Sequence, residues 1–390
     1  MCHRQIKITT YDRLLRAWEN SMEAVRDFQS YADLTEDNDK AKQAFYDFAE
    51  NSAKQAAKLR NLLLEYKKWT DFQFAWNRKR TESIKQMSFP FSYREGQKEL
   101  VTYVYQTIYH RRKLFLEAPT GVGKTISTVF PSVKAIGEGM AEKIFYLTAK
   151  TITRTVAQDC FKLLAEHGLA MKVLVITAKD KICPMEETEC NPDYCPYAKG
   201  HFDRINDAMY ELLQSENMFS RDIILECAGK HQVCPFEMSL DMSMYADAII
   251  CDYNYVFDPN VYLKRFFAEG LGSKDYIFLI DEAHNLLERG REMYSAALFK
   301  EDFLKMKKLV KKESPKLERQ LEKCNKELLA MKRECVNYRR EDMIAPFVMA
   351  LTRAYATMDE FLEEHDSMPE RSELLDFYFD IAHFLNMYEI

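Results

Sequence analysis

The nine residues EAPTGVGKT (117–125) are the feature that most constrains what this chain can fold into. They follow a short apolar run that is expected to be a strand, and a helix is expected to begin after them. Gly121 and Gly123 allow the backbone to turn its N–H groups towards phosphate oxygens. Lys124 would reach the terminal phosphates, and the Thr125 hydroxyl could ligate magnesium. The stretch therefore predicts a phosphate-binding loop, although Ala stands where the generic pattern has its first glycine.

Short apolar runs recur through the middle of the chain, and helical patterns separate several of them. Continuous apolar strands that alternate with helices favour a parallel sheet covered on both faces. The fold class predicted from this pattern is α/β. The runs are KLFLEAP (113–119), KIFYLTA (143–149), MKVLVIT (171–177), DAIICDYN (247–254) and YIFLIDEAH (276–284).

The run LIDEAHNL (279–286) supplies a second set of candidate catalytic residues. Its apolar residues lead to the carboxyl end of a strand, where Asp281 and Glu282 emerge. Asp281 would hold a magnesium ion, and Glu282 would orient and deprotonate an attacking water. Either carboxylate alone could simply cap the next helix. Together with the phosphate loop and with His284, the pair predicts nucleotide hydrolysis.

A cluster of cysteines interrupts the alternating pattern at about 178–246. The N-terminus has no signal-peptide core, and no run approaches the ~18 apolar residues of a membrane helix, so we expect a cytoplasmic protein without membrane contact. In that compartment clustered thiols indicate a metal site or a catalytic role rather than disulfides. Four thiolates can enclose either zinc or an iron–sulfur cluster. The predicted ligands are Cys183, Cys190, Cys195 and Cys234, with Cys227 as an alternative to Cys234.

The flanking regions are predicted to be helical. Residues 1–88 are polar, with aromatic residues at helical spacing, and their role is unknown. After residue 290, apolar residues recur at four- and three-residue steps, which indicates a long helix packed against a partner. The positions of that seam are Leu317, Leu321, Cys324, Leu328, Met331, Cys335 and Tyr338. A last helix is expected to carry Leu374, Phe377, Ile381, Leu385 and Tyr388.

These motifs resemble one family. APTGVGKT followed by DEAH is similar to superfamily 2 DEAH-box helicases, and the cysteine-bearing insertion resembles their iron–sulfur branch, the XPD/DinG-like DNA helicases. The resemblance implies a RecA-like motor domain, 89–182 with 247–290, an iron–sulfur lobe, 183–246, and an incomplete helical Arch-like domain, 291–390. It also favours [4Fe–4S] over zinc. A second motor domain has no counterpart in the sequence, so a truncated reading frame or a fragment is expected.

The resemblance also implies roles for individual residues. FPFSYREGQ resembles the segment that grips adenine, and YLTAKTITRTVAQD resembles motif Ia, which touches the DNA backbone. His284 would couple ATP hydrolysis to strand movement. Tyr253 and Tyr255 fit either base stacking or a buried position. The implied ATP-binding set is Arg94, Gln97, Thr120, Gly121, Val122, Gly123, Lys124 and Thr125. The implied DNA-binding set is Thr148, Lys150, Thr151 and Arg154.

The function predicted is an ATP-dependent DNA helicase that translocates 5′ to 3′ on single-stranded DNA and opens duplex junctions, with ATP, Mg²⁺ and a [4Fe–4S] cluster as cofactors. A formal net charge of −6 requires that any DNA-binding surface be a local basic patch. Two alternatives keep the fold: an ATP- and DNA-binding module that does not hydrolyse ATP alone, and a zinc-stapled ATPase that does not act on DNA.

Overall fold

The computed structural model describes residues 10–119, 121–149, 151–268, 275–333, 335–365, 368 and 370–390. Its centre is a five-stranded sheet in the order β3-β2-β4-β1-β5. β2 pairs in parallel with both β3 and β4, with Val173 opposite Met218 and Ala248. The predicted parallel α/β fold is confirmed. The strands are β1 (Lys143–Thr148), β2 (Val173–Val175), β3 (Met218–Phe219), β4 (Ala248–Asp252) and β5 (Tyr276–Ile280).

The strand expected at residues 113–119 is not formed, although these residues are described. The run KLFLEAP has no strand pairing, and Phe115 in its middle is 90% exposed. A strand needs a hydrogen-bonded neighbour, and this stretch lies outside the ladder of the sheet, so its apolar character alone does not make it one. Conversely, β3 was not predicted, because a two-residue strand carries no readable periodicity.

Two compact units divide the chain, and each is described by itself. The first comprises Met1–Tyr146, Thr155–Ile250 and Lys274–Leu279, and the second comprises Leu147–Arg154, Cys251–Ser273 and Ile280–Ile390.

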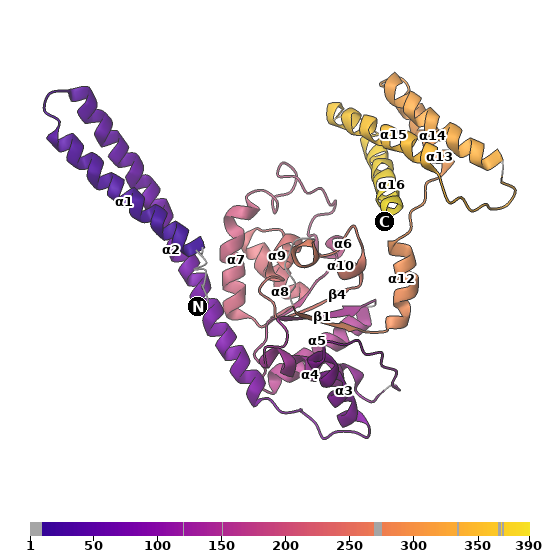
Figure 1. Cartoon of the computed structure of the whole chain (residues 1–390), viewed down its shortest axis with the longest axis horizontal. Coiled ribbons are helices and arrows are strands. Elements are labelled where there is room, and N and C mark those ends of the chain that lie inside the picture. Colours follow the sequence, from indigo (N-terminus) through magenta and orange to yellow (C-terminus); the bar gives the residue numbers. More distant parts are fainter. Residues whose placement is uncertain are drawn as a thin grey trace, which may run out of the picture. The chain divides into compact units, whose positions relative to one another are not determined.

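Helices cover the sheet in the first unit (Figure 1). α4 and α5 pack against β1, β2 and β4 through a core that includes Val129, Val133, Phe161 and Leu164. The helices here are α3 (Gln97–Tyr109), α4 (Lys124–Gly137), α5 (Thr151–Glu166), α6 (Lys179–Ile182), α7 (His201–Ser215), α8 (Arg221–His231) and α9 (Pro235–Met242).

The N-terminal region of the first unit is a helical hairpin, α1 (Thr10–Leu34) and α2 (Asp39–Gln86) (Figure 1). Asn38 caps α2 by accepting from the Ala41 backbone N–H at 3.1 Å. The second half of α2 is fixed by aromatic contacts, because Trp69 stacks on Tyr245 and meets the edge of Tyr210.

The second unit contains a helical region with its own apolar core. Leu317, Leu321 and Cys324 are fully buried in it, as the heptad-like spacing predicts. α14 ends at Arg333, however, so Tyr338 lies beyond the helix and is 89% exposed. The elements of the second unit are α10 (Asn254–Phe257), α11 (Lys264–Phe267), the 3-10 turn η1 (Ala283–Asn285), α12 (Leu286–Met293), α13 (Lys300–Val310), α14 (Pro315–Arg333), α15 (Ala345–Glu364) and α16 (Arg371–Glu389).

Among the described residues, none of the helices combines the length and the apolar character that crossing a membrane requires.

Candidate functional site

The predicted phosphate loop ends where α4 begins. Gly121 and Gly123 have φ values of 86° and 77°, a left-handed conformation that glycine adopts without a steric penalty. Lys124 is the first residue of α4, so its side chain starts at a helix N-terminus, and its Nζ donates to the Ala118 carbonyl at 3.2 Å. This loop has the local backbone that anion binding by successive N–H groups requires.

Arg94 and Gln97, the predicted adenine-binding residues, both contact this loop. The Arg94 guanidinium donates to the Gly121 carbonyl, and Gln97 Nε2 donates to the Val122 carbonyl at 3.2 Å. Gln97 Oε1 accepts from the Arg94 backbone N–H at 3.0 Å. Gln97 is only 5% exposed, so it is not an ordinary surface residue of α3. Arg94 and Gln97 therefore stabilise the backbone of the phosphate loop through these hydrogen bonds.

Three predicted site residues have no described side chain. Thr120 and Lys150 lie outside the described residues, and only the backbone of Thr151 is described. Of the other predicted DNA contacts, Thr148 is fully buried, and its hydroxyl is hydrogen-bonded to that of Thr153. Arg154 is half-buried. Thr148 therefore connects the end of β1 to the first turn of α5 rather than facing solvent.

The acidic pair lies in the second unit, directly after β5. The Asp281 backbone N–H donates to the Leu147 carbonyl at 2.9 Å, which extends the β-ladder to this residue. Glu282 has a φ of 53°, which is unusual for a residue with a side chain. Its carboxylate Oε2 lies 3.4 Å from His284 Nδ1. The side chains of Glu282 and His284 are exposed, so each is accessible to a ligand.

Sequence reasoning did not identify the residues that hold this acidic pair in place. Tyr253 is fully buried, and its hydroxyl donates to the carbonyl oxygens of Asp281 and Glu282, the latter at 3.1 Å. Burial is the main cause that raises the pKa of Tyr253 to about 12, and the nearby carboxylates are the second. The buried alternative for Tyr253 is therefore correct, and base stacking by this ring is excluded.

The predicted metal ligands are only partly brought together. Among the described residues, no group of three or more His, Cys, Asp or Glu side chains could hold a metal ion. Cys190 and Cys234 nevertheless share a neighbour, Lys179. A hydrogen bond to Cys190 and the negative charges of the two thiolates and of Glu237 raise the pKa of Lys179, against the opposing effect of burial. Cys183 is partly buried and Cys195 is buried. The four thiols do not form a coordination shell in this geometry.

Three other cysteine and histidine side chains of this region make contacts within the protein. Cys227 Sγ donates to the Ala208 carbonyl at 3.6 Å, and burial raises its pKa to about 11. His201 is only 4% exposed, and its Nδ1 accepts from the Cys234 backbone N–H at 3.2 Å. His201 begins α7 and faces the start of α9, which explains its burial. His231 Nε2 lies 3.0 Å from Glu211.

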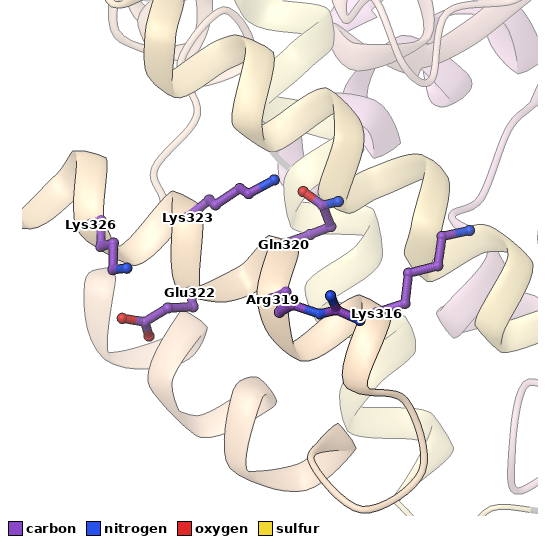
Figure 2. Close-up of a pocket in the computed structure, with 6 residues that line it drawn as sticks. All are labelled: Lys316, Arg319, Gln320, Glu322, Lys323 and Lys326. Atoms are coloured by element: carbon purple, nitrogen blue, oxygen red, sulfur yellow. The ribbon is translucent and has the colours of Figure 1, made fainter.

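The helical region presents a basic surface on α14. Figure 2 shows the side chains that line a shallow concavity of about 340 Å³ there. Two of its charges are engaged: Lys316 with Glu360 at 2.5 Å, and Glu322 with Lys307 at 2.8 Å. The lining residues are Lys316, Arg319, Gln320, Glu322, Lys323 and Lys326.

A parallel α/β sheet, a left-handed glycine loop that opens a helix, and an acidic pair at a strand end together are typical of the phosphate-loop nucleotide-binding class. Comparison with known proteins gives the finer assignment. Residues 165–303 match the DEAD_2 family model. The resemblance of this chain to the XPD/DinG-like branch of superfamily 2 helicases is thereby confirmed.

The relatives are distant and longer than this chain. Human regulator of telomere elongation helicase 1 is 22% identical over 270 residues, which cover 55% of this chain and 21% of that protein. The general transcription and DNA repair factor IIH helicase subunit XPD of Dictyostelium discoideum is 22% identical over 225 residues, which cover 51% and 29%. The chain thus spans between a fifth and a third of the length of these relatives.

Two solved structures are also similar. One, described as an XPD helicase, has a TM-score of 0.46 and 19% identity, covering 76% of this chain and 51% of that one. The other, described as a truncated XPD, has a TM-score of 0.45 and 19% identity, covering 75% and 81%.

Proposed function

We propose that this chain is part of an ATP-dependent DNA helicase that couples ATP hydrolysis to 5′ to 3′ movement along single-stranded DNA and to duplex opening. The observation that carries the proposal is the DEAD_2 match over 165–303, which includes the DEAH sequence and lies downstream of the phosphate loop that opens α4. The curated relatives named above are helicases, and one is a DNA repair subunit. The activity of the whole protein is part of this proposal.

Each site residue has a role in the proposed reaction. Lys124 and the loop from 120 to 125 would bind the phosphates of ATP. Thr125 and Asp281 would hold Mg²⁺, which supplies charge neutralisation at the phosphates. Glu282 would take a proton from the attacking water, and its Oε2 lies 3.4 Å from Nδ1 of His284, the residue that the resemblance implies couples hydrolysis to strand movement.

The hydrolytic role of Glu282 is tested by single-turnover ATP hydrolysis with single-stranded DNA. Glu282→Gln keeps the size of the side chain but removes the base, so the rate should fall by about 10²-fold or more while nucleotide affinity stays similar. Glu288→Gln, on the exposed side of α12, is the matched control and should hydrolyse normally. A wild-type chain that binds nucleotide and DNA but never hydrolyses ATP would support the binding-module alternative.

We further propose that Cys183, Cys190, Cys195 and Cys234 hold a [4Fe–4S] cluster. The support is the resemblance, together with the common neighbour of Cys190 and Cys234 at Lys179. Closing the shell would require rearrangement of the loop that carries Cys183, Cys190 and Cys195, where no strand and only turns and bends are found in residues 184–200.

Iron, acid-labile sulfide and zinc per chain, measured after anaerobic purification, test the cluster. About four irons with matching sulfide are expected for this cluster type, and Cys190→Ser should abolish both. Cys324→Ser is the control, since Cys324 is buried among the helices of the second unit. Stoichiometric zinc without sulfide would favour the zinc-stapled ATPase instead, especially if DNA binding that weakens steeply with salt is also missing.

A further inference from the structure

Tyr253 occupies a position that the proposed reaction does not by itself explain. It follows β4 directly, and its ring is fully buried. Its hydroxyl donates to two consecutive carbonyl oxygens, those of Asp281 and Glu282. A buried tyrosine normally satisfies its hydroxyl with one partner. Here the partners are the backbone groups of both proposed catalytic carboxylates.

The backbone at Glu282 needs such support. A residue with a side chain at φ 53° is strained, and it persists only where its surroundings hold it. The Glu282 carbonyl accepts from the Asn285 backbone N–H at 2.9 Å and from Asn285 Nδ2 at 3.0 Å, in addition to the Tyr253 hydroxyl. Three donors thus converge on one carbonyl oxygen and fix the peptide from which the Glu282 side chain projects.

The neighbours of Tyr253 hold the same segment at its other end. Arg289 Nη2, on α12, lies 3.4 Å from Asp252 Oδ1 and 3.5 Å from Asn254 Oδ1. Asp252 Oδ1 also accepts from the Asn254 backbone N–H at 3.0 Å. The tripeptide Asp252-Tyr253-Asn254 therefore contacts both the start and the end of the segment 281–289, and all of these groups lie in the second unit.

We propose that Tyr253 is a positioning residue for ATP hydrolysis: its hydroxyl holds the 281–282 backbone in the left-handed turn that aims the Glu282 carboxylate. This inference rests on the proposed function, because it assumes that Glu282 acts on water. Tyr253 itself is too deeply buried to touch a substrate. Because burial raises its pKa to about 12, the hydroxyl keeps its proton and remains a donor throughout the working pH range.

Tyr253→Phe tests the proposal because it keeps the buried ring and removes only the hydroxyl. Tyr294→Phe is the matched control: the Tyr294 hydroxyl also donates to a backbone carbonyl of the second unit, that of Phe257 at 3.0 Å, but not in the acidic segment. In single-turnover assays Tyr253→Phe should lower the hydrolysis rate about tenfold, the effect of one hydrogen bond. Its affinity for Mg-ATP should stay within about twofold of wild type, and Tyr294→Phe should change neither.

Amide hydrogen exchange provides a readout that does not depend on activity. The Asn285 N–H donates to the Glu282 carbonyl, so its protection reports whether the turn is held. Tyr253→Phe should speed exchange at 281–285 and leave exchange in α13 to α16 unchanged.

Each outcome distinguishes the two proposals. If wild type hydrolyses no ATP, the proposed function fails, but faster exchange confined to 281–285 in Tyr253→Phe would still support a positioning role. Unchanged exchange at Asn285 in Tyr253→Phe would overturn the inference. An equal loss of rate and nucleotide affinity, with faster exchange throughout the unit, would also overturn it, because that is the result of a general structural role.

Discussion

The two ends of the central strand β4 carry polar residues of different kinds. Before its first residue lies Asp247, which is 4% exposed and has several hydrogen-bond donors around it. At its last residue lies Asp252, followed by Tyr253 and Asn254, which contact the acidic segment. In parallel sheets the strand starts meet at one edge and the strand ends at the other, and ligands bind at the carboxyl edge. β4 has an anchoring end and an end that serves the proposed site.

The amino edge holds buried charges that are fully used by the fold. Lys143 starts β1, and its Nζ donates to the Ser243 carbonyl at 2.9 Å. Lys172 precedes β2, and its Nζ donates to the Leu213 carbonyl at 2.6 Å and to Asn217 Oδ1 at 2.8 Å. Asp247 receives Arg80 and Trp76 from α2. Such groups fix the strand starts and the long helix α2, and they leave little capacity for a ligand.

The carboxyl edge is held differently. Tyr253 contacts backbone carbonyls there, so the side chains of Glu282 and His284 remain exposed. A buried charge such as Asp247 is held by its partners, and removing either side of such a pair is costly, whereas a charge whose backbone alone is fixed stays available for chemistry. Burial and backbone support, rather than residue type, distinguish Asp247 from Glu282.

Asp247→Ala should give the largest loss of stability. It leaves the Arg80 guanidinium and the Trp76 indole N–H half-buried without their acceptor, and breaking a buried ion pair costs about 3–5 kcal/mol. Urea unfolding followed by tryptophan fluorescence measures this free energy. Asp275→Ala is the control, since its ion pair with Arg111 is exposed and should contribute less than about 1 kcal/mol. Equal losses in the two variants would remove the distinction between buried anchor and surface pair.

Lys172 should make the free energy of unfolding rise with pH in the alkaline range. Burial lowers its pKa from 10.5 to about 8. Below pH 8 both the folded and unfolded chains carry the proton, so the cost of burying the ammonium is constant. Between pH 8 and 10.5 the unfolded chain binds a proton that the folded chain does not, so stability rises with pH. The gain attributable to Lys172 is about 3 kcal/mol across that window.

The measurement is the difference in unfolding free energy between wild type and Lys172→Met at a series of pH values from 7 to 10.5. Trp76 is a suitable probe, because the Lys172 ammonium lies 4.1 Å from its ring centroid. The unfolding free energy of Lys172→Met should lack the part of the rise between pH 8 and 10.5 that Lys172 contributes. Parallel profiles for the two proteins would contradict a buried, readily deprotonated Lys172.

Much of the fold could be predicted because its signals are local. The apolar runs KIFYLTA and YIFLIDEAH contain β1 and β5, and the GVGKT loop opens α4 at Lys124, where its glycines require it. The seam on α14 was readable because Leu317, Leu321 and Cys324 repeat with the helical period.

The remainder depends on contacts between residues far apart in the chain. Nothing in KLFLEAP indicates that it would have no strand beside it. Tyr253 reads as an ordinary buried aromatic residue, and only the fold brings its hydroxyl to a carbonyl 29 residues away. Sequence spacing likewise placed four thiols in one region but could not fix their mutual distances, because the long connections between them are loops and short helices.

Asp252→Ala should have the smallest effect on stability, although it lies on the same strand as Asp247. Asp252 is only partly buried, and its contact with Arg289 is 3.4 Å long, so its loss should cost about 1 kcal/mol or less. Its effect should instead be local: faster amide exchange in the first turn of α12, measured beside Asp247→Ala, which should speed exchange in the second half of α2. If Asp252→Ala destabilised the protein as much as Asp247→Ala, the carboxyl end of β4 would be an anchor as well. The exposure of the Glu282 and His284 side chains would then need an explanation other than a difference between the two ends of β4.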